Sequence, residues 1–261
     1  MTTSPYASLR IKRTRVSTFS PAPHFESSRS FCYSGLVSIP RPIAGVLFDW
    51  DGTLIDSYHA DSQAYLAMFE ELGIPWGLPE LDQHYSPDWY TVYRAAGIPN
   101  ARWEQADQLW RAHYARHRPK LMRGTRKVLR QLAGRHRLGL VSSGDRKRVL
   151  RQLRECRLTQ RFHARVCGGD TVNRKPHPEP LLKALNQMKL DALECVYVGD
   201  TPEDLQMARA AGVCAIAVLG PFPTEKKLRA EKPDFLLEKL EELPGLLRKR
   251  FVVASKRKPR A

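Results

Sequence analysis

The chain has 261 residues, 42% of them hydrophobic, which is enough for a folded core and argues against global disorder. Its formal charge is +16, but residues 1–43 hold six Lys or Arg against one acid, and residues 248–261 hold seven against none. The body between these ends carries only about +4, so the basic composition does not mark it as a nucleic-acid-binding domain. We expect residues 1–42 and 246–261 to be disordered, solvated ends without a nucleic acid contact.

Cysteine use and hydropathy indicate a protein of a reducing compartment that does not span a membrane. The five cysteines form no C-x-x-C pair and no zinc-ligand spacing. No apolar run approaches the ~20 residues that cross a bilayer. We therefore expect a cytoplasmic location. The first 43 residues are rich in Ser and Arg and poor in acids, which is typical of an organellar transit peptide, and this stays the alternative.

The first predicted strand, residues 44–48, ends in two carboxylates, Asp49 and Asp51, followed at once by Gly52. In an extended segment residues i and i+2 point to the same side, so both carboxyl groups face one place. In open α/β sheets ligands bind at the carboxyl ends of strands. Two such close acids repel each other unless a cation or a proton lies between them, which suits phosphoryl chemistry better than a structural role.

Residues 57–123 are predicted to form an inserted helical domain without β-strands. Tyr65, Met68, Phe69 and Leu72 recur at helical spacing, and Gly73 ends that helix. A second aromatic stripe follows at Trp103, Ala106, Trp110 and Tyr114. Stripes of this kind usually pack into a core, so we expect the insert to have its own small apolar core.

Four more apolar runs alternate with helical patterns after this insert, and each run ends in small, glycine or acidic residues. They are residues 138–141, 162–167, 195–198 and 214–219. Short, continuously apolar strands that alternate with helices predict a parallel sheet covered on both faces. Pro178 is expected to open a helix that ends near Met188. Thr201 and Asp204 have the spacing of a helix N-cap and its capping box.

Three further polar signals follow these strands: Ser142, Lys175 and Asp200. Together with the Asp49–Asp51 pair they resemble, in order, the four motifs of the haloacid dehalogenase superfamily of phosphohydrolases. The resemblance covers roughly residues 43–245 and is nearest to the phosphoglycolate-phosphatase-like branch. It implies a Rossmann-like three-layer α/β core at residues 43–56 and 124–245, with an all-helical cap at residues 57–123.

The residue chemistry suits this resemblance. Asp49 is the natural nucleophile, because a carboxylate can attack phosphorus and form an aspartyl-phosphate. Asp51 can protonate the leaving alkoxide and then take a proton from the attacking water. Ser142 and the backbone N–H of Ser143 would bind the phosphate. Lys175 would balance the charge of the transferring group.

Mg²⁺ is the expected cofactor, because it prefers hard oxygen ligands and takes few of them from protein. The resemblance implies three ligands: the carboxylates of Asp49 and Asp200 and the backbone carbonyl of Asp51. Asp204 has two interpretations, as the acid of the capping box or as support for the metal site.

We therefore predict a Mg²⁺-dependent phosphatase that hydrolyses a small phosphorylated metabolite, as a monomer or homodimer. A sugar-phosphate mutase or a pyrophosphatase of the same superfamily stays open. Residues 57–123 hold seven Lys or Arg and eight Asp or Glu, so their charge does not indicate the substrate. The alternative from another class is a non-catalytic module that binds nucleic acid through its basic ends.

Overall fold

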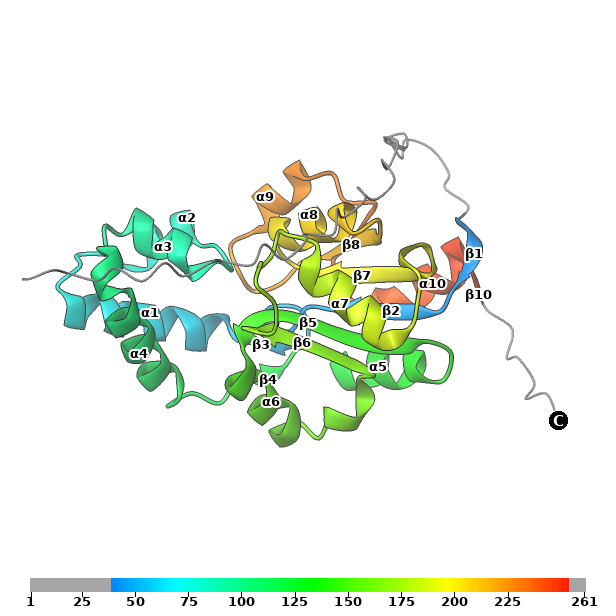
Figure 1. Ribbon diagram of the computed structural model, residues 1–261, viewed down its shortest axis with the longest axis horizontal. Coiled ribbons are helices and arrows are strands. Elements are labelled where there is room, and N and C mark those ends of the chain that lie inside the picture. The colour runs from blue at the N-terminus through cyan, green and yellow to red at the C-terminus, as the bar shows by residue number, and fades with distance from the viewer. Residues whose placement is uncertain (1–38, 254–261) are drawn as a thin grey trace, which may run out of the picture. The chain divides into compact units, whose positions relative to one another are not determined.

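The computed structural model describes residues 39–253, drawn as the coloured ribbon in Figure 1. The disorder predicted for the two ends concerns residues 1–38 and 254–261, which lie outside the described residues. Between residues 39 and 253, no helix combines the length and the apolar composition needed to cross a membrane.

The centre of the fold is a six-stranded parallel sheet with the strand order β6-β5-β2-β7-β8-β9. Its strands are β2 (Gly45–Phe48), β5 (Arg137–Asp145), β6 (Ala164–Gly168), β7 (Cys195–Gly199), β8 (Cys214–Val218) and β9 (Phe235–Leu237). All five strands predicted from apolar runs are present, and β9 is a sixth that we did not predict. All four residues of β2 are buried, as its continuous apolar run requires.

Helices cover both faces of this sheet (Figure 1). The helices are α5 (Thr125–Ala133), α6 (Arg146–Glu155), α7 (Glu179–Met188), α8 (Pro202–Ala210), α9 (Glu225–Ala230) and α10 (Leu243–Arg250). Val46 and Phe48 of β2 belong to the apolar core that holds α5, α6 and α10. Leu47 belongs to the core that holds α7, α8 and α9. Successive residues of one strand thus supply two cores, and the predicted three-layer α/β fold is confirmed.

The insert contains four α-helices between two very short strands, β3 (Ile55–Asp56) and β4 (Lys120–Leu121), which pair antiparallel. The helices are α1 (Tyr58–Leu72), α2 (Leu78–His84), α3 (Trp89–Ala95) and α4 (Trp103–Tyr114). The expectation of no strand in this region is therefore wrong at β4. The apolar stripe of α1 is buried in an apolar core of the insert, to which α3 and α4 also contribute. Gly73 ends α1 with φ of 72°, a backbone conformation that suits glycine.

Ordered structure extends past both predicted ends of the core. β1 (Ile39–Ile43) pairs in parallel with β10 (Phe251–Val253), so strand and helix occupy positions that the sequence assigned to basic ends. Short 3-10 helices complete the described chain at Asn100–Arg102, Thr159–Arg161, Ala192–Glu194 and Leu240–Glu242.

Candidate active site

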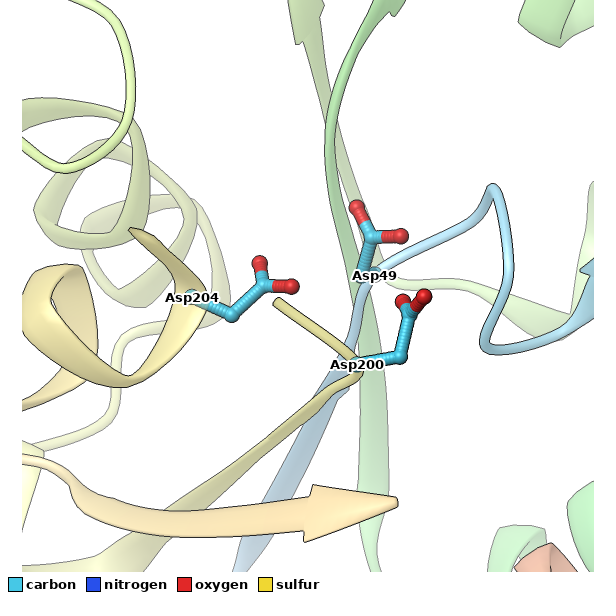
Figure 2. A group of neighbouring side chains, drawn as sticks. All are labelled: Asp49, Asp200 and Asp204. Atoms are coloured by element: carbon cyan, nitrogen blue, oxygen red, sulfur yellow. The ribbon is translucent and has the colours of Figure 1, made fainter. Parts of the chain in front are cut away.

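The strand order explains how distant polar residues meet. β5, β2 and β7 are neighbours in the sheet, and their carboxyl ends carry Ser142, Asp49 and Asp200. The backbone N–H of Asp49 donates to the Val198 carbonyl at 2.9 Å, which continues the pairing of β2 with β7 by one residue. Figure 2 shows the carboxyl groups of Asp49 and Asp200 close together, with Asp204 approaching from the start of α8.

Lys175 is a buried ammonium between two carboxylates. Its Nζ donates to Asp49 Oδ1 and to Asp204 Oδ1, each at 2.6 Å, and 3% of its side chain is exposed. Burial alone would lower the pKa of Lys175, but the charges of Asp204 and Asp49 raise it above its ordinary value. Lys175 therefore remains a fixed positive charge beside Asp49.

Asp204 uses both oxygens to support its surroundings. Oδ2 accepts from the Thr201 hydroxyl at 2.8 Å and from the Thr201 N–H at 3.2 Å, which forms the predicted capping box of α8. Oδ1 accepts from Lys175 and, at 2.9 Å, from the Tyr197 hydroxyl. These hydrogen bonds confirm that Asp204 is the acid of the capping box. The same carboxylate also orients Lys175.

The carboxylates fit a hard divalent cation. Oxygens of Asp49, Asp200 and Asp204 lie within 4.8 Å of one another. Asp200 is fully buried, and its Oδ1 accepts from Thr53 at 2.8 Å while its Oδ2 has no hydrogen-bond partner. Because both oxygens of Asp204 are engaged, the oxygens available to a metal come from Asp49 and Asp200. An orphaned, buried carboxylate oxygen in an all-oxygen donor set is suited to Mg²⁺.

The pKa values reflect this crowding of acids. Burial raises the pKa of Asp49, an effect that Lys175 opposes and Asp204 reinforces. Burial, followed by the charges of Asp49 and Asp204, raises the pKa of Asp200 well above its usual value. Additional positive charge, such as that of a divalent cation, would oppose both shifts.

Gly52 leaves the space that Asp200 occupies. Its φ is +81°, and a Cβ added there would lie 2.1 Å from Asp200 Oδ2. The glycine turn after Asp51 therefore has two requirements at once, a left-handed backbone and no side chain.

Asp51 has a partner that the sequence did not predict. Its Oδ1 and Oδ2 accept from Nη1 and Nη2 of Arg148, both at 2.8 Å, in a bidentate ion pair. Burial would raise the pKa of Asp51, but the Arg148 charge and its hydrogen bonds hold it below the usual value. Arg148 is one of several basic residues at the start of α6, and nothing in the local sequence distinguishes it from its neighbours.

Arg148 is in turn held by a helix of the insert. Its Nη1 lies 3.3 Å from the hydroxyl of Tyr114, at the end of α4, and 3.3 Å from Oε1 of Gln152. Gln152 also donates to the Tyr114 hydroxyl at 3.1 Å and accepts from the Trp50 indole at 2.9 Å. This buried network connects Asp51 to α4 of the insert.

A pocket of about 810 Å³, its open mouth included, lies over these groups. The residues that line it include Asp49, Asp51, Ser142, Ser143 and Lys175, whereas Asp200 is fully buried and does not line it. Ser142 is buried, and its Oγ accepts from the Gly144 N–H at 3.0 Å. The structure thus brings the site residues predicted from the sequence to one place.

Comparison with known proteins identifies the same superfamily that the sequence motifs resemble. The profile of the haloacid dehalogenase-like hydrolase family matches residues 46–218. A Caldanaerobacter subterraneus protein that bears the name "Putative pyrophosphatase PpaX" is 30% identical over 212 residues, which cover 79% of this chain and 95% of that protein. A phosphoglycolate phosphatase of Cupriavidus necator is 29% identical over 228 residues, which cover 81% of this chain and 96% of that protein.

The fold also matches solved structures. A haloacid dehalogenase-like hydrolase from Streptococcus pneumoniae superposes with a TM-score of 0.69 at 22% identity, over 78% of this chain and 97% of that one. The family and branch that the four motifs resembled are thereby confirmed: the chain belongs to the haloacid dehalogenase-like hydrolases, among the relatives of the phosphoglycolate phosphatases.

Proposed function

We propose that this hydrolase is a Mg²⁺-dependent phosphatase that acts on a small phosphate monoester through an aspartyl-phosphate on Asp49. The observation that carries the proposal is that Asp49 lines the pocket and that its Oδ1 is held by Lys175 at 2.6 Å. Among the described residues no hydrogen bond involves Asp49 Oδ2, which leaves that oxygen for attack on phosphorus.

The chain's own groups divide the work between two half-reactions. Asp49 displaces the alcohol from phosphorus, while Asp51 gives its proton to the leaving oxygen. Asp51 then accepts a proton from the water that hydrolyses the aspartyl-phosphate. The ion pair with Arg148 keeps Asp51 ionised, which suits this second role and has to loosen for the first. Ser142 and the Ser143 N–H would bind the phosphate oxygens, beside the fixed charge of Lys175.

Asp49, Asp200 and the Asp51 backbone carbonyl would hold Mg²⁺, which when bound supplies positive charge against the phosphate oxygens. The helices of residues 57–123 would act as the cap over the pocket, because Tyr65, Trp110 and Arg111 from α1 and α4 line it. Cytoplasmic location and a monomeric or homodimeric state belong to this proposal as well.

A pyrophosphatase is the second candidate, because relatives at 27% and 29% identity are designated pyrophosphatase PpaX. A sugar-phosphate mutase would use the same catalytic groups. Phosphate release from pyrophosphate, from phosphoglycolate and from a sugar phosphate, measured side by side, separates these activities.

The test is release of phosphate from an aryl phosphate with and without Mg²⁺. Wild type should turn over only with the metal, and Asp49→Asn should lose at least about 10³-fold, since it removes the nucleophile. The matched control is Asp191→Asn, an exposed aspartate before the amino end of β7, which should keep wild-type turnover. Full activity in Asp49→Asn would refute the proposal.

A further inference from the structure

Every cation that lines the pocket already has a carboxylate partner. Lys175 lies 2.6 Å from Asp49, Arg148 lies 2.8 Å from Asp51, and Arg111 lies 2.7 Å from Asp145. A second anionic group on a substrate would therefore meet only cations whose charge is already shared with a carboxylate. The pocket is therefore poorly suited to a substrate that carries a carboxylate or a second phosphate.

Two carboxylates in the same lining have no such partner. In the described part of the chain no Lys, Arg or His side chain makes a salt bridge to Asp61 of α1 or Asp107 of α4. Asp107 accepts a hydrogen bond from the Tyr93 hydroxyl at 2.9 Å. Burial, with the nearby charge of Asp51, raises the pKa of Asp61 to about 7. Burial also raises the pKa of Asp107. In both cases burial outweighs the nearby positive charges, those of Arg148 at Asp61 and of Arg111 and Arg174 at Asp107.

Six aromatic side chains line the same pocket. They are Tyr65, Tyr85, Trp89, Tyr93, Trp110 and Phe222. These rings already attract cations of the protein itself. The Arg174 guanidinium lies 4.1 Å from the Trp89 ring centre, and the Arg148 guanidinium lies 5.9 Å from that of Trp110. Rings and carboxylates together provide the environment that binds ammonium groups in proteins.

Tyr65 gives an independent indication of a ligand. It is only 4% exposed and lines the pocket, yet no hydrogen bond within residues 39–253 involves its hydroxyl. The hydroxyl is accessible from the pocket, and an accessible hydroxyl without a protein partner is expected to meet water or a ligand there.

We propose that the alcohol part of the substrate carries an ammonium group, so that the enzyme hydrolyses phosphate monoesters of amino or choline-like alcohols. This inference rests on the proposed phosphatase function. The P–O ester bond would break as Asp49 attacks phosphorus, and the alcohol would leave with the proton from Asp51. Water would then release inorganic phosphate from Asp49. The cation would lie between Asp61, Asp107 and the aromatic side chains of the pocket.

The test compares phosphocholine with 3,3-dimethylbutyl phosphate, which has the same shape but carbon in place of the charged nitrogen. Wild type with Mg²⁺ should favour phosphocholine by about 10-fold or more in kcat/KM, because a desolvated cation–π site discriminates by up to about 30-fold. Asp61→Asn should reduce this ratio toward one. Glu104→Gln, an exposed acid on α4 that does not line the pocket, should keep it.

Failure of this inference and failure of the phosphatase function give different results. Turnover of an aryl phosphate with a phosphocholine ratio near or below one would overturn the ammonium pocket and leave the phosphatase intact. If no ester is turned over, calorimetric binding of choline against 3,3-dimethylbutanol still decides the matter. Choline should bind at least about 10-fold more tightly to wild type, and equal binding or none would overturn the inference.

Discussion

Asp200→Asn should make the metal-free protein more stable and at the same time remove its response to Mg²⁺. The substitution keeps the Oδ1 acceptor for Thr53 and removes a charge whose other oxygen has no partner. Even at 4.8 Å, the upper limit of the separations in this cluster, two like charges repel by about 3.5 kcal/mol at an effective dielectric constant of 20. Protonation and Lys175 already relieve part of this repulsion, so we expect a net gain of about 1–2 kcal/mol at pH 8.

The pH dependence has a definite sign. The pKa of Asp200 is higher in the folded protein than in the unfolded chain, so its contribution to stability is favourable at low pH and is lost as pH rises through the folded value. The advantage of Asp200→Asn over wild type should therefore be smaller at pH 5.5 than at pH 8.

Urea unfolding in chelator at both pH values, then with Mg²⁺, measures these effects. Mg²⁺ at 100 times its Kd should stabilise wild type by about 2.7 kcal/mol and Asp200→Asn by less than about 0.5 kcal/mol. The exposed Asp191→Asn variant should behave as wild type. A lower free energy of unfolding for Asp200→Asn at pH 8 in chelator, or an undiminished response to Mg²⁺, would show that the carboxylate cluster is not a repulsive cation site.

Three further substitutions test the surrounding groups. Lys175→Met should lower the free energy of unfolding by about 3–5 kcal/mol in urea titrations, because it leaves two buried carboxylates without their cation; a loss under about 1 kcal/mol contradicts this. Arg148→Met should move the acid limb of the pH–rate profile to higher pH, because the pKa of Asp51 is no longer lowered, and an unmoved limb argues against an essential Asp51 base. Gly52→Ala should cost about 2 kcal/mol more than Gly73→Ala, which shares the left-handed backbone but has open space around it; equal costs remove the contact argument.

The sequence predicted those parts of the fold that have local signals. Apolar runs of four or more residues that end in glycine or an acid identified five strands, and the Thr201–Asp204 spacing identified the start of α8. β9 and β4 were not predicted, because β9 has only three residues and β4 only two, which is too short to show a pattern. The pairing of β1 with β10 joins Ile39 to Phe251, a contact that no local pattern contains.

The candidate site divides in the same way. Asp49 and Asp51 could be identified from their spacing after a predicted strand. The closeness of Asp200 to Asp49 depends instead on the pairing of β7 with β2, which the local sequence does not show. Arg148 could not be found, because its role comes from a bidentate contact with Asp51 across 97 positions of sequence. The second role of Asp204, as a partner of Lys175, likewise exists only once the loop before α7 has folded against α8.

Charge balance connects the metal site to the substrate that we propose. Asp49, Asp200 and Asp204 face one ammonium, that of Lys175, so a divalent cation would bring this inner group to neutrality. A phosphate monoester then adds negative charge next to a pocket whose lining cations are all paired. A substrate with its own ammonium group introduces less net charge than one with a carboxylate, and it places that ammonium beside Asp61 and Asp107. The same requirement, that a buried charge needs a partner, would thus account for a metal on one side of a bound phosphate and for a substrate cation on the other.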